Sequence, residues 1–121
     1  MYQVLTMYGE NEPWWFFGDW REDIREIQQF STFEEAQVEY RKQWEILRAK
    51  YEHIHIKPNF LTAFWNDGEE HWCEDCVEGL QLFLGLALLK DDKPVTIEVD
   101  RAFYESISEE AKEKICIRKQ A

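Results

Sequence analysis

The amino-acid sequence predicts an α+β domain in which a mainly antiparallel sheet packs against one long amphipathic helix. Two observations carry this prediction. A helical apolar stripe covers about residues 32–51, and short apolar runs joined by tight turns lie on both sides of it. A chain of 121 residues is long enough for one ordinary hydrophobic core. We therefore expect a single domain over residues 1–121.

The composition is that of an acidic, aromatic-rich globular protein. The chain has 25 Asp and Glu against 14 Lys and Arg, a net charge of −11, and 45% hydrophobic residues. This apolar content excludes disorder, and the low Gly and Pro content without a repeat excludes collagen-like and low-complexity chains. The acidic field repels nucleic-acid phosphates and anionic membranes. We therefore expect no direct DNA binding and no membrane association.

The sequence predicts a cytoplasmic protein. Residues 1–5 have neither a basic flank nor a small-residue cleavage site, and the longest uncharged run, residues 79–89, is too short to span a bilayer. The three cysteines are an odd number and lack the density of a disulfide-stapled secreted domain. We expect them to be free thiols in a reducing compartment.

The first thirty residues are predicted to form strands. Residues 2–8 are mostly apolar, as in a strand covered on both faces. Residues 9–13 are typical of a turn, and residues 14–17 then form a second strand of a hairpin. Residues 20–30 fit either a helical stripe or, from residue 24 onward, a strand, and we favour the strand.

The clearest predicted element is the helix over about residues 32–51. Ser31 or Thr32 can cap its start, because each is followed three residues later by a Glu. Acids lie early in the helix and bases late, which suits the helix dipole. The apolar residues recur at spacings of three and four and so share one face: Phe33, Ala36, Tyr40, Trp44, Leu47 and Tyr51.

Two strands joined by a tight turn are expected directly after the helix. Residues 60–65 form the first strand and residues 70–73 its return strand, with the turn at Asn66–Glu69. Leucines alternate from Leu80 to Leu89, which favours one long strand with Gly85 as a possible bulge. A helix is the alternative here, because Leu, Gln and Ala are good helix formers.

The C-terminal part is predicted to contain a short strand and a helix. Residues 90–94 form a turn, and the β-branched residues 95–99 form the strand. Apolar residues then recur every four positions from Phe103 to Ile115, which predicts a C-terminal helix.

A series of short segments carries a family resemblance. In chain order they are Met7–Phe17, Trp20, Asp23–Ile24, Ser31–Ala36, Thr62–Trp65, Trp72–Cys76, Leu80–Gln81 and Leu86–Leu89. With these segments the chain resembles an uncharacterised small-protein family of low-GC Gram-positive bacteria, a domain of unknown function. The resemblance implies a single cytoplasmic domain. Some members are labelled as DNA-binding proteins, and no catalytic or binding residue is implied.

His71, Cys73 and Cys76 are the sharpest candidate for a metal site. A strand places His71 and Cys73 on one face, and a turn could bring Cys76 round to them. Structural zinc needs a fourth ligand, so our main expectation is two small thiols in a turn and no cofactor, with zinc as the alternative. His53 and His55 are expected at the solvated end of the long helix.

The aromatic run Trp14, Trp15, Phe16 and Phe17 is the candidate interaction patch. In a strand, Trp14 and Phe16 point to one side and Trp15 and Phe17 to the other. One pair covers the core, and the other either packs within the chain or forms an exposed patch for an unknown protein partner or a second copy.

No motif of an enzyme is present in the sequence. It contains no Gly-rich phosphate loop, no nucleophile elbow and no helical His-Glu-x-x-His motif. On these grounds, the sequence predicts a non-enzymatic protein-interaction module with an acidic, aromatic-rich surface. The alternative is a zinc-bearing or nucleic-acid-associated regulatory protein.

Overall fold

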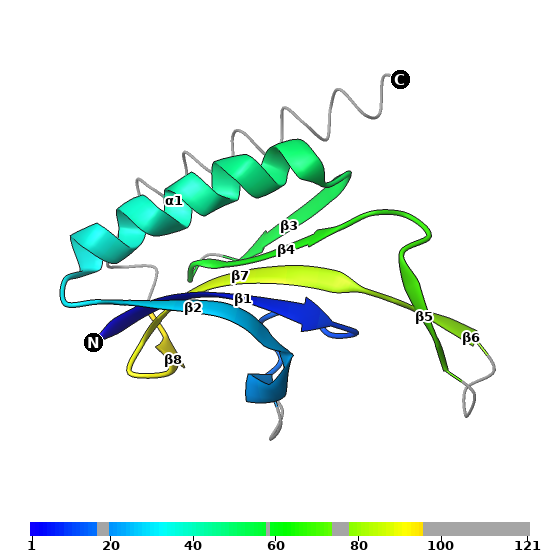
Figure 1. The fold of residues 1–121 in the computed structure, drawn as a ribbon, viewed down its shortest axis with the longest axis horizontal. Coiled ribbons are helices and arrows are strands. Elements are labelled where there is room, and N and C mark those ends of the chain that lie inside the picture. The colour runs from blue at the N-terminus through cyan, green and yellow to red at the C-terminus, as the bar shows by residue number, and fades with distance from the viewer. Residues whose placement is uncertain (17–19, 58, 74–77, 96–121) are drawn as a thin grey trace.

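The computed structural model describes residues 1–16, 20–57, 59–73 and 78–95. It confirms the mixed α+β class, with one helix lying across an antiparallel sheet (Figure 1). The elements are β1 (Tyr2–Gly9), a 3-10 helix (Trp20–Asp23), β2 (Ile24–Phe30), α1 (Phe33–Lys50), β3 (His53–Lys57), β4 (Leu61–Trp65), β5 (Glu70–Cys73), β6 (Glu78–Gln81), β7 (Phe83–Lys90) and β8 (Lys93–Pro94).

The main sheet has the strand order β2-β1-β7-β4-β3, and every neighbouring pair is antiparallel. β8 forms a short hairpin with the end of β7. The longest pairing joins β1 to β7, from Tyr2 opposite Lys90 to Gly9 opposite Phe83. β5 and β6 pair with each other as a separate two-stranded sheet beyond the end of β4 (Figure 1). The two edges of the main sheet are therefore β2 and β3.

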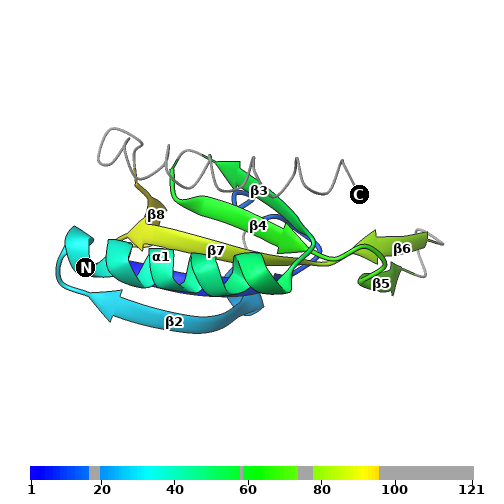
Figure 2. The same cartoon turned by 90° about the horizontal axis from the view of Figure 1, so that it is seen from above.

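The predicted helix is confirmed as α1. Its N-cap is Thr32, whose hydroxyl accepts a hydrogen bond from the Glu35 backbone N–H and donates to the Glu35 carboxylate at 2.9 Å. The first of these bonds is the N-cap half of the expected capping box, and in the second the Glu35 carboxylate binds the Thr32 hydroxyl. Ala36, Tyr40 and Trp44 are fully buried against the upper face of the sheet. Figure 2 shows the helix lying along this face. No helix in the described residues is long and apolar enough to cross a bilayer.

The second face of the sheet has an apolar cluster of its own. It is built from alternate residues of the central strands, Leu5, Met7, Leu61, Ala87 and Leu89. The segment between β1 and β2 lies over this cluster. Pro13 in that segment packs so closely on β7 that a Cβ at Gly85 would come within 2.7 Å of its ring. The glycine thus allows the covering segment to reach the strand, and the predicted bulge at Gly85 is wrong because its pairing is regular.

The predicted strand at residues 14–17 is wrong for its described part. Residues 14–16 form turns and irregular backbone, with the Trp15 N–H donating to the Glu12 carbonyl at 3.2 Å. β1 is already paired on both sides, by β2 and β7, so no edge is left for a third neighbour. The strand favoured for residues 24–30 is confirmed as β2.

The helix end and the following hairpin also differ from the prediction. Helix α1 ends at Lys50, and His53 and His55 lie in strand β3 because Ile54 and Ile56 alternate with them and pack beneath the helix. The return strand β5 pairs with β6 and not with β4. The Gln81 amide, which is distant in sequence, donates to the carbonyls at both ends of the Asn66–Glu69 turn and so brings β6 beside β5.

The leucine-rich run is extended, which excludes the helical alternative. It is broken at Leu82 into β6 and β7, because the Leu82 N–H turns to donate to the Glu69 carbonyl at 2.9 Å. Val95 is buried, but residues 96–99 of the predicted short strand and the predicted C-terminal helix at 103–115 lie outside the described residues.

We predict that Gly85→Ala lowers the free energy of unfolding by about 1 to 3 kcal/mol, the usual cost of overpacking. The new Cβ would lie 2.7 Å from Pro13 Cβ, so the covering segment would have to move. Urea unfolding measures the loss. In a Pro13→Gly background the loss should shrink, and an equal loss in both backgrounds would show that this contact is not the cause.

Candidate functional site

The aromatic run that begins at Trp14 lies over the face of the sheet opposite α1. The Trp14 ring meets the His55 ring edge-on at 4.9 Å between centroids, and Lys57 Nζ lies 5.1 Å from the Trp14 ring. Phe16 meets Trp20 edge-on at 5.0 Å. Both Trp14 and Phe16 pack against the second apolar cluster. These two side chains therefore close the core on this face.

Trp15 points away from the sheet. It is 52% exposed, and its indole N–H donates to the Glu12 carboxylate at 2.7 Å. Phe17 lies outside the described residues. Of the three described members of the predicted patch, Trp15 is thus the one that offers a broad apolar surface to a partner.

The predicted metal ligands lie on the separate two-stranded sheet. The β5 backbone pairs His71 with Leu80 and Cys73 with Glu78, so His71 and Cys73 occupy alternate positions of one strand. Cys76 lies outside the described residues. The convergence of these three residues on a metal stays a prediction.

A different group of potential ligands meets where β3 begins. His53 Nε2 lies 2.9 Å from Asp67 Oδ1 and 4.0 Å from Glu52 Oε2. The His53 ring also stacks on Trp65 at 5.2 Å. Within the described ranges, Glu52, His53 and Asp67 are the group of potential metal ligands whose side-chain ligand atoms all lie within 4.8 Å of one another. An ion pair between His53 and the exposed Asp67 accounts for the arrangement without a metal.

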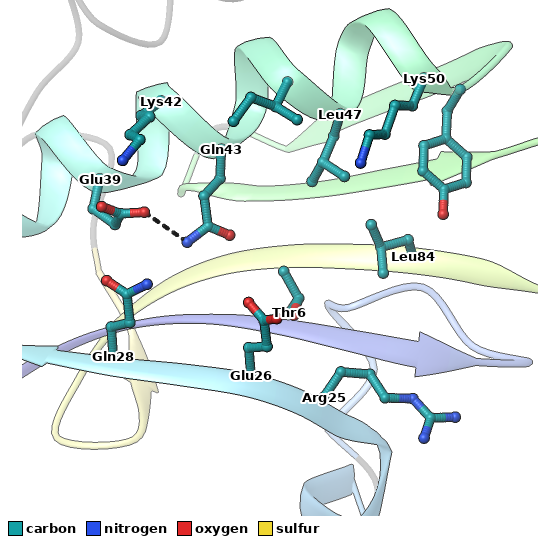
Figure 3. A pocket seen from close by; sticks show the side chains of 12 residues that line it. Thr6, Arg25, Glu26, Gln28, Glu39, Lys42, Gln43, Leu47, Lys50 and Leu84 are labelled. Atoms are coloured by element: carbon teal, nitrogen blue, oxygen red, sulfur yellow. Dashed lines mark hydrogen bonds between the residues drawn. The ribbon is translucent and has the colours of Figure 1, made fainter.

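A groove of about 500 Å³ runs between α1 and the strands β1 and β2 (Figure 3). In it, the Gln43 amide donates to the Glu39 carboxylate at 2.9 Å. The sheet contributes Thr6, Arg25, Glu26, Gln28 and Leu84, and the helix side contributes Glu39, Lys42, Gln43, Ile46, Leu47, Lys50 and Tyr51.

The two flanks of α1 differ in how their charges are paired. On the flank away from the groove, Arg41 and Arg48 both contact the Glu45 carboxylate, at 3.8 and 3.3 Å. On the groove flank, neither Lys42 nor Lys50 has an ion pair within the described residues. The groove lining therefore carries three cations, Arg25, Lys42 and Lys50, against two carboxylates, Glu26 and Glu39, and is net positive in a protein of net charge −11.

One end of the groove adjoins a tyrosine–carboxylate pair. The Tyr8 hydroxyl donates a hydrogen bond to the Glu69 carboxylate, and the Arg25 guanidinium lies 5.6 Å from the Tyr8 ring. The hydrogen bond to Glu69, together with burial and the negative charge, raises the pKa of Tyr8 to about 12. Burial and Glu69 also raise the pKa of Tyr51. Both phenols thus remain neutral over the physiological range.

β2 forms an open edge beside this groove. It is the terminal strand of the sheet, and its residues 26–30 pair with β1 in regular register, with the one irregularity confined to the step between Thr6 and Met7. Residues 26–30 include no proline and one charge, Glu26. Native edge strands are commonly protected by charges, prolines or bulges. Ile27 is 47% exposed on the opposite face. Within the described residues, no strand pairs with the outer side of β2, and residues 27–30 carry no charge.

Sequence reasoning did not find the groove, because it depends on where α1 crosses the sheet. A signal was nevertheless present. Polar Glu26 and Gln28 occupy one face of a strand, where a core-facing strand would carry apolar side chains. The flank of the helix that carries Lys42 and Lys50 has one acid in the groove, Glu39, whose carboxylate accepts a hydrogen bond from Gln43 and, within the described residues, forms no ion pair with either lysine.

Comparisons with known proteins identify one family. The sequence profile of a family described as "Protein of unknown function (DUF1033)" matches residues 1–118. No curated protein and no solved structure matches the chain.

We predict that Trp14→Ala and Trp15→Ala differ in their effect on stability. Removing the packed Trp14 ring should cost about 2 kcal/mol or more, because it opens a cavity over the second cluster. Removing Trp15, which is 52% exposed, should change stability by about 0.5 kcal/mol or less. Urea midpoints of the two variants measure this difference. Equal losses would mean that Trp15 also supports the core.

We predict that Glu69→Gln lowers the pKa of Tyr8 from about 12 toward its ordinary value of 10.0, because the carboxylate that stabilises the protonated phenol is removed. Below pH 10, the phenol is neutral in both folded and unfolded chains, and the stabilisation is fully present. It is lost as the pH rises toward 12, where the unfolded chain has released the proton.

The Tyr8 titration can be followed by NMR of the ring Cζ carbon. Glu22→Gln, which removes an acid of the 3-10 helix, should leave the pKa of Tyr8 unchanged. If the pKa of Tyr8 is the same in Glu69→Gln as in the wild type, the hydrogen bond to Glu69 is not what raises it.

Proposed function

Because the chain belongs to this family of unknown function, we propose a function from its own surfaces, that of a non-enzymatic protein-interaction module. We place partner binding along the open edge of β2 and the adjoining groove. One observation supports this most directly: a seven-residue edge strand lies beside a groove of about 500 Å³ whose lining has more cations than carboxylates.

The chemistry of the groove favours binding over catalysis. Its lining includes no Ser, Cys or His, the residues that most often serve as nucleophile or general base. It offers long polar side chains together with Leu47, Leu84 and the half-exposed Ile46. Such a surface suits a polypeptide, which brings its own backbone hydrogen bonds and several side chains.

An edge strand can supply both affinity and selectivity. Backbone N–H and C=O groups on its open side can pair with an extended segment, as in other cases of strand addition. Alternate side chains of the added strand then face either the groove or the opposite side of the sheet. We therefore propose that the protein partner expected from the sequence binds at this edge and not at the aromatic run.

We predict that the immobilised wild-type chain captures a specific protein from a lysate of its source cells, and that Ile27→Lys abolishes this capture. A lysine in place of the half-exposed Ile27 protects the edge against strand addition at little cost in stability. Val38→Lys is the matched control, because Val38 is 71% exposed on α1 and does not line the groove.

Mass spectrometry of the captured proteins compares the three baits, and circular dichroism verifies that each bait is folded. A partner retained by wild type and Val38→Lys but lost by Ile27→Lys is the expected result. Equal retention by all three baits would place the binding surface elsewhere.

A further inference from the structure

Resting on the proposed function, we infer that the partner is an extended segment with alternating acidic and apolar residues, added as a strand to the open edge of β2. Its acidic side chains would enter the groove toward Lys42 and Lys50, and its apolar side chains would lie beside Ile27 on the opposite face.

Helix α1 runs alongside β2. Figure 2 shows the two elements side by side and running in opposite directions, and Figure 3 shows the groove flank of the helix above β2. A strand added to the open edge would lie about 4.8 Å beyond β2. Side chains on its upper face would then rise next to the groove flank of α1, where Lys42, Ile46 and Lys50 lie.

The spacing of the two lysines matches the repeat of a strand. Lys42 and Lys50 are eight residues apart, about 12 Å along a helix axis. Residues i and i+4 of a strand lie on one face about 13 Å apart. Two carboxylates at these positions can therefore each approach one ammonium group. Neither lysine has an ion pair in the described residues, so the pairing would displace no existing partner.

The opposite face of the added strand has a different requirement. Ile27 alternates with Glu26 and Gln28, so it lies on the face away from the groove, where it is 47% exposed. An apolar side chain at the neighbouring position of the added strand would cover it, since directly opposed residues are in contact. Acidic residues toward the helix and apolar residues away from it give the alternating pattern.

A second copy of this chain fits the edge less well. In an antiparallel pairing of β2 with itself about Ile27, Glu26 would face Gln28 of the other copy, and each strand would bring a single carboxylate to the groove face. Each copy also carries a net charge of −11, which disfavours close association. The two lysines would remain incompletely neutralised.

Selection from a library of displayed random peptides against the immobilised full chain tests the inference. It is run at physiological ionic strength, where a Debye length of about 8 Å limits the repulsion of acidic peptides by the rest of the protein. We expect enriched peptides to alternate acidic and apolar residues, with two acids at i and i+4.

The enriched peptides are then titrated against four variants. Lys42→Glu and Ile27→Lys should each weaken binding about tenfold or more, since each places an unfavourable group against the added strand. Lys93→Glu makes the same charge change at the exposed β8 strand, and Val38→Lys makes the same apolar-to-lysine change away from the groove. Both controls should bind as the wild type does.

Several outcomes would overturn the inference while leaving an interaction module in place. Enriched peptides without acids, or peptides that bind Lys42→Glu and Ile27→Lys normally, would do so, as would lysate capture without any peptide enrichment. A dimer in sedimentation of the wild type that Ile27→Lys abolishes would assign the edge to a second copy. Failure of both capture and enrichment would refute the proposed function itself.

Discussion

The two apolar faces of the central strands are the constraint on which the structure depends. In β7, Leu86 and Leu88 face α1 while Ala87 and Leu89 face the other way, and all four are fully buried. A sheet of this kind needs a cover on each side. Helix α1 supplies one cover, and the segment between β1 and β2 supplies the other with the aromatic rings of Trp14, Phe16 and Trp20.

The open edge follows from how far these covers extend. Tyr40 and Trp44 anchor α1 over the central strands, and the hydroxyl of Tyr40 lies 2.7 Å from that of Thr62 in β4. The helix packs mainly on β7 and β1 and reaches β2 at Phe30, and the upper face of β2 along the groove is left to Glu26 and Gln28. An excess of cations in the groove, and an edge strand whose charges and register shift lie only at its start, add little to stability. Such departures from what stability favours are typical of binding surfaces.

The parts of the fold that the sequence predicted are those determined by local interactions. The capping box of Thr32 and Glu35 and the apolar stripe of α1 identify the helix wherever it packs. The neighbour of β5, by contrast, depends on a side chain distant in sequence, Gln81, which holds the Asn66–Glu69 turn. The groove was beyond prediction for a related reason. Its shape depends on the crossing of α1 over β2, which no local pattern specifies.

The pairing of β1 with β7 has a consequence for how the chain folds. β1 and β2 are separated by residues 10–23, whereas β7 begins only at residue 83, so β1 can pair with β2 before β7 has been made. Until then, the apolar side chains of β1, including Val4 and Leu5, lack the strand that completes both layers. Pairing between segments distant in sequence slows folding and prolongs the time during which hydrophobic surface is exposed. During synthesis, β1 and β2 therefore remain without this cover until β7 has been made.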